Sequence, residues 1–214
     1  MKIAIFGTGV VGNTIATKLV KLGHEVKMGS RAAGNAKAVE WAKANGAKAS
    51  EGSFADAAAF GELAFNCTLG VGALDAVQAG GKDLAGKILV DVSNPLDFSK
   101  GMPPTLFVCS TDSLGEQIQR ALPDTKVVKT LNTVNCNLMV DASLLKGDHD
   151  MFMCGNDAGA KGQVKEILTG WFGWKNVIDL GDITGARAQE AYLLLWVRLY
   201  GALQTPNFNV HLAR

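Results

Sequence analysis

The sequence lacks the features that mark membrane-spanning, exported and nucleic-acid-binding proteins. No apolar run approaches the roughly 20 residues of a membrane span, and the opening residues 1–6 hold only four consecutive apolar side chains, far fewer than a secretory signal needs. The 21 basic and 20 acidic residues nearly cancel, and neither sign forms a long run. The phosphate backbone of a nucleic acid therefore finds no electrostatic partner. We expect a cytoplasmic protein that binds neither membranes nor nucleic acids.

Residues that usually carry metal or acid–base chemistry are also scarce. The four cysteines lack metal-ligand spacing and lie in or beside apolar runs, which predicts no metal site and reduced, mostly buried thiols: Cys67, Cys109, Cys136 and Cys154. Neither tyrosine has a lysine four residues later, so the short-chain dehydrogenase pair is absent. The G-x-x-x-K-x-x-x-N helix of the β-hydroxyacid dehydrogenases is missing too. The three histidines, His24, His149 and His211, fit structural or solvated positions better than catalytic ones. We expect no catalytic side chain.

Short apolar runs alternate with amphipathic stretches of helical length along the 214 residues. Strands are expected near 2–6, 24–29, 47–49, 62–68, 87–92, 105–109, 126–131, 150–154 and 176–180. This alternation is typical of βαβ units and predicts an α/β fold with a doubly wound, mostly parallel sheet. No Pro/Ser-rich linker interrupts it, so we expect one domain over 1–214, whose portion 131–214 forms the substrate side and a dimer interface.

A glycine-rich turn follows the first expected strand and opens the first expected helix. It reads Gly7-Thr8-Gly9-Val10-Val11-Gly12 and fits G-x-G-x-x-G, the phosphate-binding motif of Rossmann folds. Glycine lets the backbone approach a pyrophosphate, and the free amides of a helix N-terminus attract its charge. In that helix Val11, Ile15, Leu19 and Leu22 form an apolar stripe, and Gly23 ends it. The alternative interpretation is a purely structural turn.

The second expected strand ends in Gly29-Ser30-Arg31, where an NAD-binding protein would carry a carboxylate. A hydroxyl and a guanidinium would bind a 2′-phosphate through charge-assisted hydrogen bonds. The chain is therefore predicted to bind NADP(H). The alternative is that Ser30 and Arg31 are ordinary loop residues and that NAD binds more loosely.

Three further loops follow strands at the same edge of the sheet, where ligands of doubly wound folds bind. Thr68 and Leu69 would lie beside the adenosine and pyrophosphate. Asn94-Pro95 and the segment Asn132-Thr133-Val134-Asn135-Cys136-Asn137 would frame the nicotinamide. A simple turn at Asn94-Pro95, and capping of the following helix by the asparagine-rich segment, are the structural alternatives.

The last expected helix, about 185–203, has few charges. Arg187, Glu190 and Arg198 fall within one strip about 80° wide, so nearly the whole remaining circumference should be covered. A helical extension that pairs with a second subunit is expected, and the alternative is a helix buried within one chain.

Several motifs, spread over the full chain, resemble the F420-dependent NADP oxidoreductases, whose fold recurs in the cytosolic domain of the STEAP metalloreductases. They are G-T-G-x-x-G at 7–12, G-S-R at 29–31, V-D-V-S-N-P-L at 90–96, V-V-K-T-L-N-T at 127–133 and the closing stretch 196–214. The resemblance implies that Ser30 and Arg31 bind the 2′-phosphate with Thr8 nearby. It also implies that backbone groups of Val134 and Cys136 hold the nicotinamide carboxamide, with the deazaflavin pocket above that ring.

The chain departs from this family pattern at three places. Leu131 replaces an aromatic residue, Asn135 replaces a proline, and Asn35 replaces a basic residue for which Lys37 could substitute. A polar Asn135 beside the ring could suit a flavin or another acceptor.

Without a catalytic acid or base, hydride transfer works when the partner is itself a redox cofactor, because a flavin or deazaflavin exchanges its proton with solvent. The sequence therefore predicts an oxidoreductase that moves hydride between NADPH and F420, a flavin or a related small acceptor. One alternative is a non-catalytic NADPH-binding module that senses redox state. Another is an NADPH-dependent reductase of small imines or carbonyls, with His149 or water as proton donor.

Overall fold

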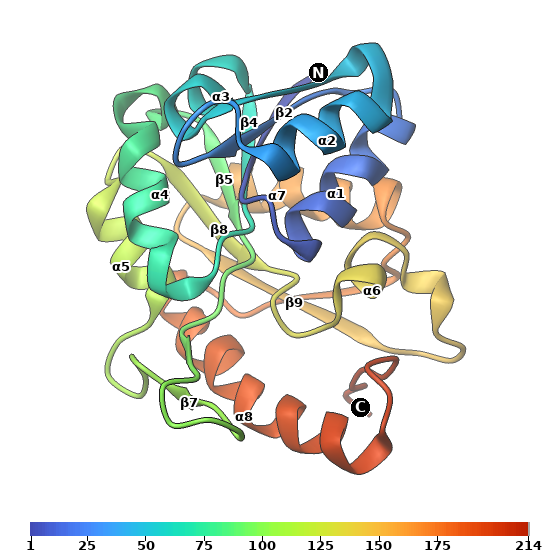
Figure 1. The fold of residues 1–214 in the computed structure, drawn as a ribbon. Coiled ribbons are helices and arrows are strands. Elements are labelled where there is room, and N and C mark those ends of the chain that lie inside the picture. The colour runs from blue at the N-terminus through green and yellow to red at the C-terminus, as the bar shows by residue number, and fades with distance from the viewer. Residues whose placement is uncertain (214) are drawn as a thin grey trace.

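A computed structural model describes residues 1–213 and contains one large sheet (Figure 1). The strand order across it is β10-β9-β8-β5-β4-β1-β2-β3. The strands are β1 (Lys2–Phe6), β2 (Glu25–Ser30), β3 (Ala49–Ser53), β4 (Leu63–Asn66), β5 (Ile88–Asp91), β8 (Lys126–Thr130), β9 (Asp150–Gly155) and β10 (Asn176–Asp179).

Six neighbouring strands, β3-β2-β1-β4-β5-β8, run parallel. This is the order of two βαβαβ halves that meet between β1 and β4, so the predicted doubly wound sheet is confirmed. Strand β9 pairs antiparallel with β8, and β10 pairs parallel with β9. The sheet is therefore mostly parallel, with an extension of two reversed strands.

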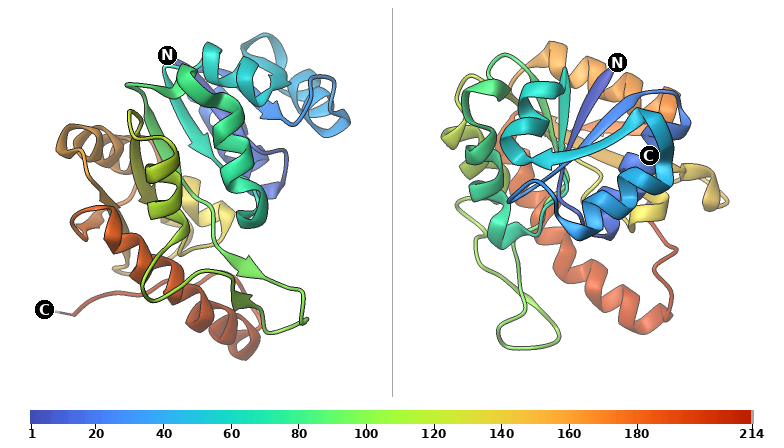
Figure 2. Two further views of the ribbon diagram at one scale, coloured as in Figure 1. Left: turned by 90° about the vertical axis from the view of Figure 1, so that its left-hand side faces the viewer. Right: turned by 45° about the horizontal axis from the view of Figure 1, so that its top comes forward.

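Helices cover both faces of the sheet (Figure 2). They are α1 (Val10–Lys21), α2 (Ala36–Asn45), α3 (Phe54–Phe60), α4 (Ala73–Gly80), α5 (Leu114–Ala121), α6 (Cys136–Val140), α7 (Ala158–Glu166) and α8 (Ala186–Leu203). Helices α1, α2, α6 and α7 contribute to one buried apolar cluster, and α3, α4, α5 and α8 contribute to the other. No helix within residues 1–213 combines the length and the apolar character that crossing a bilayer demands.

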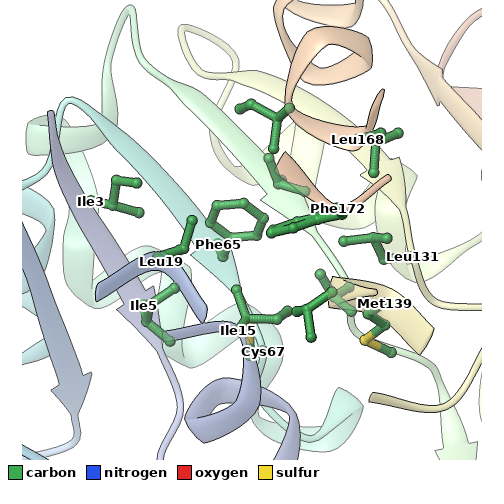
Figure 3. Close-up of a cluster of buried hydrophobic side chains, with 14 of the residues drawn as sticks. Ile3, Ile5, Ile15, Leu19, Phe65, Cys67, Leu131, Met139, Leu168 and Phe172 are labelled. Atoms are coloured by element: carbon green, nitrogen blue, oxygen red, sulfur yellow. The ribbon is translucent and has the colours of Figure 1, made fainter. Parts of the chain in front are cut away.

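Strand β1 serves both clusters because alternate side chains of a strand point to opposite faces. Ile3 and Ile5 join the α1 side, whereas Ala4 and Phe6 join the α4 side. Figure 3 shows Ile3 and Ile5 beside Ile15 and Leu19 of α1. The predicted stripe of α1 is thus buried at Ile15 and Leu19, but Leu22 lies beyond the last turn and is 43% exposed.

Two expected strands differ from the structure. Residues 105–109 do not join the main sheet; β7 (Thr105–Leu106) pairs only with β6 (Leu96–Asp97) in a small antiparallel hairpin. The adjacent Pro103-Pro104 lacks the backbone N–H groups that a longer ladder needs. The strand expected at 47–49 lies at 49–53, because Gly46–Lys48 forms a 3₁₀ turn.

The expectation about the thiols holds for only part of the set. Cys67 and Cys154 are buried, Cys136 is half-buried and Cys109 is exposed. Cys109 follows the β6–β7 hairpin, which projects from the body of the protein (Figure 1); Phe107 nearby is 45% exposed, whereas Val108 packs against the core.

Helix α8 turns a partly polar face inward. Gln189, Glu190 and Leu193 are buried, while Leu194 and Leu195 are 45% and 53% exposed. The few charges of this helix thus do not all face solvent, and a set of its leucines does.

Candidate functional site

The glycine turn has the geometry of a close-packed phosphate loop. Gly7 has φ +115°, and a Cβ there would come within 2.7 Å of the Cys67 carbonyl oxygen. A Cβ at Gly12 would collide with the Gly7 carbonyl, so this glycine brings α1 against the turn. A Cβ at Gly9 would meet no heavy atom within 4 Å. The outer glycines are needed for packing, and the middle one borders open space.

The N-terminus of α1 is uncompensated. Gly9 is its N-cap residue and offers no side chain to the first amides, and the first turn has no acidic residue. The helix dipole and the free N–H groups therefore favour an anion at this end.

A cavity of about 530 Å³ lies directly over this turn. Its lining includes many of the residues that the sequence predicts for cofactor binding, namely Gly7, Thr8, Gly9, Ser30, Arg31, Thr68 and Leu69. The sheet brings them together because β1, β2 and β4 end at the same edge. The other residues of the motif lie outside this lining. Val10 lines a neighbouring hollow, Val11 packs against the core, and Gly12 is a buried residue of α1.

The Ser30 hydroxyl is already engaged. The side chain is 5% exposed, and its Oγ donates to the Ala32 carbonyl at 2.6 Å. A phosphate oxygen would compete with Ala32 for this hydrogen. Arg31 is exposed, so its guanidinium is the freer of the two groups.

Asn35 occupies the position where the family pattern has a basic residue. Its side chain caps α2 by accepting from the amides of Lys37 and Ala38 at 3.1 and 3.3 Å, and it also lines the cavity. Lys37 lines the neighbouring hollow instead, together with Thr8 and Gly9. Asn35 therefore lines the cavity over the glycine turn, and Lys37 lines the hollow next to it.

Sequence reasoning missed part of this lining. Phe54 follows β3, and its ring lies 5.4 Å from that of Phe6. Asp75 in the first turn of α4 adds a carboxylate to the cavity. A general signal was present, because both residues begin helices that follow strands at the ligand-binding edge.

The other predicted loops meet at a second place. Asn94 Nδ2 donates to the Asn132 carbonyl at 3.0 Å, and Asn132 Nδ2 donates to Asn94 Oδ1 at 2.9 Å. Pro95 and Val134, which follow these asparagines closely in sequence, are buried. Cys136 is the first residue of α6 and is half-buried. None of these five residues is among the lining of the cavity over the glycine turn.

Two backbone features keep these loops close. A Cβ at Gly70 would collide with the Asn94 carbonyl, so the loop after β4 touches the loop after β5. Leu131 has φ +63°, a conformation that non-glycine residues seldom adopt and that costs about 1–3 kcal/mol. The surrounding contacts must hold it there.

Asn135 caps the helix that follows it, as the structural alternative for the asparagine-rich segment predicts. Its Oδ1 accepts from the amides of Asn137 and Leu138 at 2.9 and 3.3 Å and caps α6. Its Nδ2 donates to the Pro206 carbonyl at 2.6 Å, which ties the C-terminal segment to this loop. A proline at 135 could make neither contact.

A buried ion cluster that the sequence did not reveal lies beneath the Asn94–Asn132 pair. Lys129 Nζ is 2.7 Å from Asp91 Oδ2 and 2.9 Å from Glu190 Oε1, and these side chains are 0–2% exposed. Burial opposes the charge on Lys129, but the two carboxylates outweigh it and raise the pKa of the ammonium group above its ordinary value. The one available signal was a lysine inside an apolar strand.

Most of the unpartnered buried polar atoms belong to the loop after β8 and to α8. Within residues 1–213, six buried side-chain atoms have no hydrogen-bond partner: Asn132 Oδ1, Thr133 Oγ1, Gln189 Oε1, Tyr192 OH, Trp196 Nε1 and Asn209 Oδ1. The first two lie in the loop after β8, and the next three lie at helical spacing along α8. Asn132 Nδ2 joins the two elements by donating to the Gln189 carbonyl at 3.2 Å. Such atoms are rare in native proteins, and a bound polar group or an ordered water would satisfy them.

His149 has a separate environment. Its Nε2 lies 3.1 Å from the Ala142 carbonyl, and its ring packs edge-on against Trp174 at 5.1 Å. These contacts fit the structural role that the sequence suggested.

Comparison with known proteins assigns the chain to a family. Residues 2–95 match the family model described as NADP oxidoreductase, coenzyme F420-dependent. An F420-dependent NADP reductase of Methanocaldococcus jannaschii is 31% identical over 208 residues, which cover 93% of this chain and 92% of that protein. The metalloreductase STEAP3 of Rattus norvegicus is 28% identical over 195 residues, covering 89% of this chain and 36% of that protein.

A crystal structure of a candidate F420-dependent NADP-reductase from Arthrobacter sp. FB24 superposes with a TM-score of 0.95 at 52% identity, and each chain is covered completely. The predicted resemblance is confirmed: this chain belongs to the F420-dependent NADP oxidoreductase family and is related to the STEAP metalloreductase.

Proposed function

We propose that this protein is an NADP(H)-dependent oxidoreductase that passes hydride between NADPH and the deazaflavin F420. The observation that carries the proposal is the division of the site into two parts. One part is an anion-ready glycine turn under a cavity with a free guanidinium, and the other is a group of buried, unpartnered polar atoms. Kinship with two F420-dependent NADP reductases supports the same chemistry.

The residues present fit the phosphate groups of NADP(H). The open space at Gly9 accepts a pyrophosphate against the free amides of α1, and the exposed Arg31 with Ser30 accepts the 2′-phosphate. Thr8, Thr68 and Leu69 complete the wall of this cavity. Gly9 and Arg31 thus bind the charged end and orient the nucleotide along the strand ends.

The nicotinamide end fits the second part of the site. Backbone groups of Val134 and Cys136 are proposed to hold the carboxamide, and Asn94 with Asn132 frames the ring. Unpartnered oxygens such as Thr133 Oγ1 and Gln189 Oε1 are acceptors for the N–H groups of the carboxamide.

When bound, NADPH supplies the hydride and the deazaflavin ring receives it, so the protein need only hold the two rings face to face. No side chain is proposed to donate a proton. The contribution of this chain is to bind the phosphates, fix the carboxamide and keep water from the transfer site.

Addition of acceptors to purified protein with NADPH tests this proposal. NADPH oxidation is expected with F420, and FMN, FAD and ferric chelates serve as the comparison acceptors. Preference for a flavin would change the acceptor and keep the rest of the proposal. Tight NADPH binding with no turnover for any acceptor would favour a redox-sensing module instead.

We also propose that two copies pair through α8, so that residues 131–214 form the substrate side and the dimer interface. Leu194, Leu195 and Leu203 are 45–53% exposed on this helix, and Phe98 and Met102 of the β6–β7 hairpin region add 49% and 68% exposed apolar side chains. Exposed apolar residues concentrated on neighbouring elements are typical of an interface. Light scattering is expected to give twice the 22.5 kDa mass, and Leu195→Glu to give the monomer. A monomeric wild-type protein at micromolar concentration would contradict the pairing.

A further inference from the structure

The ammonium group of Lys129 has no unused donor. Its Nζ contacts Asp91 Oδ2 at 2.7 Å, Glu190 Oε1 at 2.9 Å and the Ser93 carbonyl at 2.6 Å. An ammonium group has three N–H donors, so these three acceptors use all of them. The side chain is fully buried, and one cation therefore joins β8, the loop after β5, and α8.

The two carboxylates are equally well satisfied. Asp91 Oδ1 accepts from the Ser93 hydroxyl at 2.7 Å and from Asn66 Nδ2 at 2.9 Å. Glu190 accepts from the amides of Leu114 and Gly115 at 2.8 and 2.9 Å, at the start of α5. Two anions face one cation, and the N-terminus of α5 offsets the remaining negative charge.

Close packing keeps Glu190 at that helix end. A Cβ at Gly115 would lie 2.9 Å from the Cβ of Ala186, so glycine allows α8 to approach α5. Only this approach lets one carboxylate reach both the α5 amides and Lys129.

Two partners of Lys129 are adjacent in sequence to groups that frame the proposed nicotinamide site, and the third, Asp91, lies three residues before Asn94. Ser93 precedes Asn94, and Glu190 follows Gln189, whose carbonyl accepts from Asn132. Lys129 itself lies two residues before Leu131, which has a φ of +63° and immediately precedes Asn132. The cluster is therefore linked through short stretches of backbone to both members of the Asn94–Asn132 pair.

We propose that Lys129, Asp91 and Glu190 are positioning residues that fix the Asn94–Asn132 pair for hydride transfer. This proposal rests on the function proposed above, because it assumes that the nicotinamide lies at that pair. A buried ion cluster adds less to stability than apolar residues of equal volume could, but it accepts only one geometry. That property suits a site in which two rings must meet at a fixed distance and angle.

Hydrogen exchange of the ligand-free protein tests the positioning without any turnover. Glu190→Gln keeps the size of the side chain but removes one of its acceptor oxygens and its charge. Exchange of the amides in 91–96 and 130–135 is expected to be about tenfold faster or more, as the loss of a charged hydrogen bond implies. Unchanged exchange in these two segments would overturn the proposal.

Glu116→Gln is the matched control. Glu116 joins the same two helices, because its carboxylate binds Arg187 of α8 at 2.6 Å, but it does not contact Lys129. This variant should loosen the contact between α5 and α8 while leaving exchange in 91–96 and 130–135 as in the wild type. Equal acceleration in both variants would reduce Glu190 to a purely structural role and overturn the proposal.

Kinetics supplies the second readout. In Glu190→Gln, kcat is expected to fall by about 100-fold from a small displacement of the reacting groups. The Kd for NADPH should stay within about threefold, since other residues hold the phosphates. Glu116→Gln should keep both values. If Glu190→Gln does not fold, Asp91→Asn offers the same test from the other carboxylate. An unchanged kcat in a folded variant of either residue would overturn the proposal.

The two proposals can fail separately. A wild-type protein that neither binds NADPH nor reduces an acceptor overturns the proposed function, and with it the assignment of the pair to nicotinamide. The exchange comparison would then still decide whether the cluster holds these loops.

Discussion

The glycine turn at the start of α1 and the asparagine loops beside α8 both lie at strand ends, but different contacts hold them. Backbone geometry forms the turn: two glycines pack closely, and a third borders open space. Long-range side-chain contacts form the loops, through Asn94, Asn132 and the Lys129 cluster. The first place is open and anion-ready, and the second is built largely from buried and half-buried side chains.

This difference separates binding from stability. A substitution at the turn should change what the protein binds and leave the fold intact, because few atoms pack on Gly9 or Arg31. A substitution in the cluster should disturb the fold and the placement of the reacting ring together. The four predictions below test this separation, beginning with the largest effect.

Lys129→Met should cost the most stability. It leaves the carboxylates of Asp91 and Glu190 buried without their cation, which lowers the free energy of unfolding by about 3–5 kcal/mol. Urea denaturation measures this loss. Lys126→Met on the same strand is the control, because Lys126 is 44% exposed and its contact with Asp157 spans 3.5 Å. Similar losses in both variants would remove the contrast between the two places.

Gly9→Ala should weaken NADPH binding without weakening the fold. The new methyl group meets no protein atom, but it occupies the space proposed for the pyrophosphate. Losing one charged hydrogen bond there costs about 1.5–3 kcal/mol of binding. Calorimetry measures the affinity, and Gly162→Ala, in equally open space on α7, is the control. Undiminished affinity in Gly9→Ala would place the phosphates elsewhere.

Arg31→Ala should distinguish the two dinucleotides. Loss of the guanidinium weakens NADPH by about 1–3 kcal/mol and leaves NADH nearly unchanged. Lys37→Ala is the comparison variant. Because Lys37 lines the neighbouring hollow, its loss should weaken NADPH binding less than the loss of Arg31 does. Equal weakening of NADPH and NADH in Arg31→Ala would show that the 2′-phosphate binds elsewhere.

The smallest effect concerns acid stability at the α5–α8 contact. The hydrogen bond from Arg187 lowers the pKa of Glu116 below its ordinary 4.5, against the opposing effect of burial. The contribution of Glu116 is therefore complete above about pH 4.5 and is lost as the pH falls through the lowered pKa. Glu116→Gln should show a shallower loss of unfolding free energy in this range. Identical acid profiles would mean that this contact adds nothing measurable.

The same contrast explains what the sequence could predict. The turn is a local motif, and its proposed role follows from six consecutive residues between a strand and a helix. The alternation of strands and helices likewise predicted a doubly wound, mostly parallel sheet, although not the order of its strands. These features depend on neighbours in the chain, so composition and spacing reveal them.

The cluster depends on residues that are far apart in sequence. Lys129 and Glu190 are 61 positions apart, and no spacing rule pairs a strand lysine with a helix glutamate. The charge pattern of α8 marked Arg187, Glu190 and Arg198 as one strip, but it could not show that Glu190 turns inward. The prediction that residues 105–109 form a strand of the main sheet is wrong, because their apolar residues resemble a strand and only the tertiary structure shows that their partner is β6.

The position of Glu190 in the chain has a consequence during synthesis. A ribosome that has just added Lys129 must add 61 more residues before Glu190 exists. At about 5–20 residues per second this takes about 3–12 s. Throughout that interval the nascent chain can complete the glycine turn, whereas Lys129 has only Asp91 as its anion. The proposed phosphate-binding half can thus form first, and the half proposed to align the reacting rings can assemble only after Glu190 has been added.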